Sequence, residues 1–150
     1  MKVEGEEGME IYGIIICLIL AILALWDAVK MEIPIVIIVA GSLVRIIQIT
    51  MMGIDDSLVI RHLVMSVIPG VILCLIHLIW KDKVGGADGP VMLIALAGST
   101  PKQFFIAMIA VGIISFVTGL VFLICKKNKT DQIPFVPVIA AGTVASYLLV

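Results

Sequence analysis

Most of this chain consists of long, uninterrupted runs of apolar residues, and these runs limit the folds that it can adopt. Hydrophobic residues make up 62% of the 150 positions, and only 14% are charged. An average soluble domain is about half apolar and about a quarter charged. A soluble fold of this length has no core large enough to bury such runs, whereas a lipid bilayer accepts them. The sequence therefore predicts an all-α integral membrane protein.

Six apolar runs are candidate transmembrane helices; about 20 apolar residues span a bilayer core about 30 Å thick. They cover residues 11–26, 33–49, 58–80, 89–98, 104–125 and 133–150. Proline at positions Pro34, Pro134 and Pro137 is typical of a helix start, where the missing N–H costs little. The fourth run is too short to cross alone, so neighbouring protein must shield one of its ends. We expect residues 1–150 to form a single transmembrane domain, a bundle of about six helices.

The lysine positions predict the orientation of these segments, because cytoplasmic loops are enriched in Lys and Arg. If all six segments cross with the N-terminus outside, the lysines that lie inside are Lys30, Lys81, Lys83, Lys126, Lys127 and Lys129. Only Lys2 and Lys102 then lie outside, and Arg61 weakens the bias slightly. We therefore expect a multi-pass protein of the cytoplasmic membrane with its N-terminus outside.

Asp27 and Asp88 are the two carboxylates at membrane depth. A carboxylate is energetically costly there, so each is a candidate functional residue. Asp27 ends the first segment and Asp88 opens the fourth, so the six-crossing arrangement places both on the cytoplasmic side. Each also has a structural interpretation, because Asp88 is a favoured N-cap residue and Asp27 can reach interfacial water. Together they suit an aspartyl peptidase, in which an ionised carboxylate activates water and a protonated one polarises the scissile carbonyl. A helix N-terminus favours an anion, so Asp88 is the expected anion and Asp27 the expected proton holder.

Other polar residues carry weaker signals. Gly85 and Gly86 either admit the backbone of a bound peptide or form an ordinary turn. Arg45, deep in the second segment, either snorkels towards the surface or pairs with a carboxylate. His77, near the end of the third segment, is expected at the inner interface.

The sequence predicts neither a metal nor another cofactor. Asp27, Glu32 and Asp88 could in principle hold a divalent metal, but no histidine-rich cluster supports such a site. The three cysteines form no Cys-x-x-Cys pair, so they indicate neither a zinc site nor a disulfide framework. No run of basic and aromatic residues indicates a nucleic-acid partner.

Four short motifs, taken together and in order, resemble the type IV prepilin peptidases. They are Asp-Ala-Val-Lys-Met-Glu-Ile-Pro at 27–34, Ile-Pro-Gly at 68–70, Gly-Gly-Ala-Asp at 85–88 and Ile-Pro-Phe-Val-Pro at 133–137. The third motif is similar to the Gly-x-Gly-Asp motif of that family, with Ala87 in place of the second glycine. Order, spacing and helix count match across nearly the whole chain.

The resemblance implies a membrane-embedded aspartyl endopeptidase that removes the short basic leader of prepilin-like or pseudopilin-like proteins at the cytoplasmic membrane face. It implies Asp27 and Asp88 as the catalytic pair. The remaining motif positions would then line the substrate approach: Gly85, Gly86, Ala87, Pro34, Pro134, Phe135 and Pro137. The implied partners are the prepilin-like membrane protein substrate, the lipid bilayer, and components of a pilus or secretion assembly.

Two departures from the family bear on this expectation. Pro90 stands where most members have lysine, which keeps an inactive homologue open. The cytoplasmic insertion with paired Cys-x-x-Cys motifs, found in larger bacterial members, does not occur here, so we expect peptidase activity without methyltransferase activity. Two other functions also stay open from the residues: a small proton or cation transporter, and a non-catalytic membrane scaffold, each using the same two aspartates.

Overall fold

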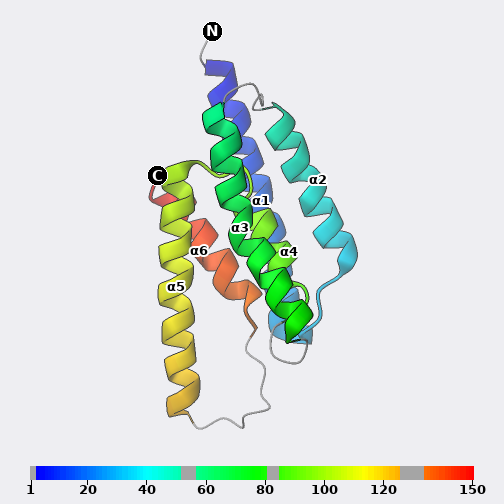
Figure 1. Cartoon of the computed structure of the whole chain (residues 1–150), viewed down its shortest axis with the longest axis vertical. Coiled ribbons are helices and arrows are strands. Elements are labelled where there is room, and N and C mark those ends of the chain that lie inside the picture. The colour runs from blue at the N-terminus through cyan, green and yellow to red at the C-terminus, as the bar shows by residue number, and fades with distance from the viewer. Residues whose placement is uncertain (1–2, 52–56, 81–84, 126–133) are drawn as a thin grey trace.

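The computed structural model describes residues 3–51, 57–80, 85–125 and 134–150, with side chains described from Ile11 in the first range and from Ile60 in the second. In these residues the regular structure is entirely α-helical (Figure 1). The helices are α1 (Val3–Lys30), α2 (Ile35–Met51), α3 (Ser57–Ile79), α4 (Asp88–Leu96), α5 (Pro101–Ile124) and α6 (Val136–Leu148). The predicted helix start at residue 133 lies outside the described residues, as do Lys81, Lys83, Lys126, Lys127 and Lys129.

Each predicted segment corresponds to one of these helices. Most helix ends lie within a few residues of the predicted ends. The largest difference is in α1, which begins at Val3 rather than at residue 11. An acidic stretch precedes the apolar run, and negative residues favour a helix N-terminus, so the helix starts before the hydropathy rises. Three stretches are long and apolar enough to cross a membrane: Ile11–Lys30 in α1, Ile60–Ile79 in α3 and Pro101–Ile124 in α5.

Consecutive helices run in opposite directions along one bundle, and the shortest helix lies at its centre (Figure 1). α4 contacts α1, α2, α3 and α6, whereas α5 packs mainly against α6. The buried residues of α4 are Gly89, Val91, Met92, Ile94, Ala95 and Leu96. At about 1.5 Å per residue, nine residues reach only about half-way through a bilayer core. The four neighbouring helices provide the shielding that such a short helix requires.

Local sequence ends α4 and begins α5 within a few residues. Gly98 has a φ of 74°, the left-handed conformation that glycine favours after a helix. Thr100 then caps α5: its hydroxyl accepts the Gln103 N–H at 3.3 Å, and the Gln103 side chain accepts the Thr100 N–H at 3.0 Å. Pro101 is the first residue of α5. A stop signal followed directly by a start signal makes the chain reverse here, so α4 stays short.

Small residues let α4 approach α3 closely at its N-terminal end. A Cβ added to Gly89 would overlap Cys74 Sγ and would lie 2.9 Å from the Cys74 backbone nitrogen and 3.0 Å from the Gly70 carbonyl oxygen. Membrane helices commonly pack through such contacts, in which backbones meet where side chains are small. The crossing at Gly70 and Gly89 therefore fixes the end of α4 that carries Asp88.

Candidate functional site

Three helix ends meet at one end of the bundle: the C-terminal end of α1 and the N-terminal ends of α4 and α6 (Figure 1). We call this the carboxylate end, because it holds Asp27, Asp88 and Val136. The sequence places the two carboxylates more than 60 positions apart. The antiparallel course of the helices returns the chain to the same end.

Asp27 is buried, with 8% of its surface exposed, so it does not simply reach water. Its Oδ2 accepts the backbone N–H of Val136 at 3.3 Å. Val136 is the first residue of α6, and its N–H has no partner within that helix. Asp27 therefore lies at the positive end of α6, although it is near the C-terminal end of its own helix.

Asp88 is the first residue of α4, and the N-cap position belongs to Ala87, whose side chain makes no capping hydrogen bond. The N-cap interpretation of Asp88 is therefore wrong. Its carboxylate turns back and accepts the backbone N–H of Gly85. A Cβ added to Gly85 would lie 3.0 Å from Asp88 Oδ2, so the glycine leaves room for the carboxylate.

The two carboxylates interact electrostatically. Asp88 lies outside the three candidate membrane spans. Burial raises the pKa of Asp88 to about 6, and the Asp27 carboxylate adds to the rise, while the Gly85 hydrogen bond and His77 act in the opposite direction. Two carboxylates in this relation resist being ionised together, so one of them tends to hold a proton.

His77 is a third titratable residue of this site, and it is one that sequence reasoning assigned only to the interface. A Cβ added to Gly86 would lie 3.0 Å from His77 Nε2, so the imidazole of α3 packs against the glycine turn. His77 also acts electrostatically on Asp88. Its place near the end of the helix that leads into the glycine motif was the available signal.

The motif prolines lie at helix starts, as expected. Pro34 is half-buried directly before α2, and its carbonyl accepts the N–H of Ile37 at 3.0 Å. Pro134 and Phe135 precede α6, and Pro137 lies in its first turn. Pro90 is in the first turn of α4, where a missing N–H leaves no broken hydrogen bond. Proline at this position is therefore compatible with the helix.

Val136, in the motif that begins the last helix, donates its N–H to Asp27. Glu32 is exposed and is not part of the site. Within the described ranges, no three His, Cys, Asp or Glu side chains lie close enough together to hold a metal ion. The site is therefore an interacting pair of carboxylates beside an imidazole.

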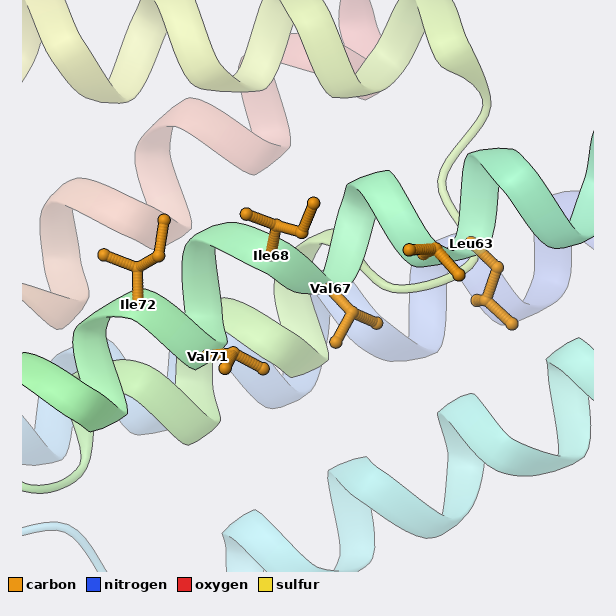
Figure 2. A pocket seen from close by; sticks show the side chains of 6 residues that line it. Leu63, Val67, Ile68, Val71 and Ile72 are labelled. Carbon is orange, nitrogen blue, oxygen red and sulfur yellow. The ribbon is translucent and has the colours of Figure 1, made fainter.

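A shallow hollow of about 360 Å³ lies on the surface of α3 (Figure 2). Its lining is wholly apolar and consists of Leu63, Val64, Val67, Ile68, Val71 and Ile72. These side chains have no group that can transfer a proton or bind an ion. The hollow is therefore not a candidate catalytic or ion-binding site, and the carboxylate end remains the candidate.

Comparison of the chain with family models, with curated proteins and with solved structures gives no match in any of the three. The candidate site therefore rests on its own geometry. A buried carboxylate that interacts with a half-buried one of raised pKa can act with it as a general base and a general acid. The two carboxylates lie at the same end of the helical bundle.

Proposed function

We propose that this protein is an integral membrane aspartyl endopeptidase that cleaves prepilin-like or pseudopilin-like substrates after a short basic leader. The observation that carries the proposal is the pairing of Asp27 and Asp88 at one end of the bundle. Their identities and order also match the two catalytic motifs in the resemblance to type IV prepilin peptidases. The apolar helices support a membrane location.

The two carboxylates take different roles. Asp27 accepts a backbone N–H at the positive end of α6, which stabilises its ionised form. Asp88 is desolvated and repelled by Asp27, and its pKa of about 6 makes it the better proton holder. We therefore assign Asp27 as the base and Asp88 as the acid. This reverses the order expected from sequence, because that expectation did not include the contact between Asp27 and α6.

The proposed reaction then balances as follows. Asp27 removes a proton from water while the water oxygen attacks the scissile carbonyl carbon. The protonated Asp88 donates a hydrogen bond to the carbonyl oxygen and gives it a proton as the tetrahedral intermediate forms. Asp88 takes that proton back when the C–N bond breaks, and Asp27 returns its own proton to the leaving amine. The carboxylates thus regain their starting states.

The orientation of the protein follows from the lysine distribution rather than from the fold. We propose that the N-terminus is outside and the carboxylate end faces the cytoplasm. A substrate with a basic leader and an apolar helix could then keep its leader in the cytoplasm and its helix in lipid. Glycine at Gly85 and Gly86, both exposed, would let a substrate backbone approach the carboxylates.

The test is a cleavage assay in membranes. This protein is co-expressed with prepilin-like candidates from its own genome, and leader loss is followed by gel shift and N-terminal sequencing. We expect wild type to cleave, and we expect Asp27→Asn and Asp88→Asn each to lower the rate by at least about a hundredfold. Asparagine keeps an oxygen that can accept the Val136 or Gly85 N–H, so the loss reports on proton transfer more than on folding.

Glu32→Gln is the matched control, because it removes an exposed carboxylate close to Asp27 in the chain. It should retain the wild-type rate. Cleavage that survives either asparagine variant would refute the catalytic assignment. If folded wild-type protein leaves every candidate intact, a transporter or a scaffold becomes the better interpretation of the paired aspartates.

A further inference from the structure

Arg45 is a buried cation that lies apart from the two carboxylates, at the opposite end of α4. It lies within the apolar helix α2 and is only 2% exposed. Its Nε donates to the Ile94 carbonyl oxygen, and its terminal nitrogens donate to the Ala95 carbonyl and to Gln48 Oε1, each at 2.7 Å. The Tyr147 side chain on α6 is a further hydrogen-bond partner. A buried guanidinium with this many partners is held in one position.

The partners of Arg45 on α4 are two of the four carbonyls that a helix C-terminus leaves without partners. The other two are bound locally. The Leu93 carbonyl accepts the Ala97 N–H at 2.9 Å, and the Leu96 carbonyl accepts the Ser99 N–H at 3.0 Å. Arg45 therefore completes the hydrogen bonding of the end of α4, and its charge lies at the negative end of the helix dipole.

The helix α6 connects this contact to the carboxylate end. Near its C-terminal end, Tyr147 binds Arg45, and at its N-terminal end, Val136 binds Asp27. Arg45 also binds the last turn of α4, whose first residue is Asp88. A helix of nine residues is nearly rigid, so its C-terminal contacts also influence where its N-terminus lies.

We propose that Arg45 is a positioning residue: by holding the C-terminal end of α4 against α6, it keeps Asp88 beside Asp27. The predicted effect of Arg45 on cleavage rests on the proposed peptidase function. The positional claim itself concerns the distance between two residues, and it can be measured without any enzyme activity.

The first experiment is cysteine cross-linking in membranes. Asp27→Cys and Asp88→Cys are combined in a background in which the native cysteines are replaced by alanine. A protease site is inserted between α2 and α3, so that a cross-link holds the two cleaved fragments together. We expect a short thiol cross-linker to join the fragments efficiently, and we expect Arg45→Met to lower the cross-linked fraction several-fold. The matched control is Arg61→Met, which removes an exposed arginine from the apolar helix α3 and should leave the fraction unchanged.

The second measurement separates positioning from general stability. In the cleavage assay, Arg45→Met should lower kcat by about tenfold to a hundredfold and leave KM within about threefold, because misplaced reacting groups slow the chemical step. Arg45→Lys should give an intermediate result, since it restores the charge but not the full set of donors. A variant that is only less stable would lower the amount of active protein without such a graded change in kcat.

The outcomes distinguish the two proposals. If Arg45→Met lowers the cross-linked fraction but the protein that retains both aspartates cleaves no substrate, the role of Arg45 is supported and the peptidase is refuted. An unchanged fraction in folded Arg45→Met would refute the role of Arg45 and leave the peptidase standing. If Arg45→Met does not fold, Tyr147→Phe decides: it removes only the hydroxyl contact and should lower the cross-linked fraction in the same direction, and no change there would refute the proposal.

Discussion

Asp27 and Asp88 share one kind of contact, although the sequences around them differ. Each carboxylate accepts a backbone N–H, from Val136 for Asp27 and from Gly85 for Asp88. Such bonds stabilise an ionised carboxylate, whereas burial and the repulsion between the pair oppose ionisation. The opposing effects keep the protonation of the site sensitive to its surroundings. This sensitivity is compatible with the proposed roles of the pair as acid and base.

The raised pKa of Asp88 predicts how stability depends on pH. Its pKa rises from 3.8 to about 6 on folding, so the folded protein binds this proton more tightly than the unfolded chain. Stability from Asp88 is therefore greatest at low pH and decreases as the pH rises through the window between those two values. Thermal unfolding in detergent at pH values across this window should show the decrease.

Asp88→Asn should flatten that dependence, because asparagine does not titrate in this range. The control Glu32→Gln should keep the wild-type slope, since Glu32 is exposed and lies outside the carboxylate pair. If wild type and Asp88→Asn show the same pH dependence of unfolding, the environment assigned to Asp88 is wrong.

At the level of the helices, α4 has an unusual combination of short length and deep burial. Its N-terminal end is packed against α3 through Gly89, and the carbonyls of its C-terminal end bind Arg45, Ala97 and Ser99. The carbonyls of the C-terminal end are thus satisfied without water, and the N-terminal end is held by close packing. This explains how a nine-residue helix can lie inside an apolar bundle.

Gly89→Ala should destabilise the protein by about 1–3 kcal/mol, because the added methyl group would be forced against Cys74 and the Gly70 carbonyl. The affected neighbours include backbone atoms, so a side-chain rotation cannot relieve the overlap. The measurement is chemical unfolding in detergent. Cleavage activity should fall as well, since Asp88 is the adjacent residue.

Gly112→Ala in α5 is the matched control for this substitution. A Cβ added there has no atom within 4 Å, and alanine favours the helix over glycine by about 1 kcal/mol. Gly112→Ala should therefore be neutral or slightly stabilising. Equal destabilisation by both substitutions would show that the α3–α4 crossing is not as tight as described.

For the whole molecule, the alternating course of the helices decides which groups share an end. The chain passes along the bundle twice between Asp27 and Asp88, once in α2 and once in α3, so both lie at the carboxylate end (Figure 1). The traverse of the bundle by the short α4 then decides at which end α5 and α6 begin. If α4 did not traverse the bundle, α5 would start at the carboxylate end rather than at the opposite one.

Labelling with a membrane-impermeant maleimide tests this topology. Glu32→Cys, Lys102→Cys and native Cys125 are each tested as the single cysteine, and all three positions are exposed. We expect Lys102→Cys to react in intact cells, and the other two to react only after the membrane is opened. Reaction of Glu32→Cys and Lys102→Cys from the same side would contradict the crossing by α4.

The sequence by itself determined the helices and their approximate limits. Apolar runs separated by charged or glycine-rich stretches are local signals, and so are a proline at a helix start and the glycine at Gly98. Counting the runs was also enough to place Asp27 and Asp88 at the same end, because that result depends only on how many helices lie between them. The function remains a prediction that rests on this pair and on the motif resemblance.

Only the tertiary structure decided which helices touch and which polar groups meet. Asp27 binds Val136 across 109 positions, and Arg45 binds Ile94 across 49, and neither contact has a local signal. In a soluble helix, the division between polar and apolar faces indicates which side is buried. Helices such as α3 and α5 are apolar on nearly every side, so hydropathy does not identify their packing faces. Their neighbours are chosen by close backbone approach at small residues and by the need to satisfy buried polar groups, which become specific only once the helices are assembled.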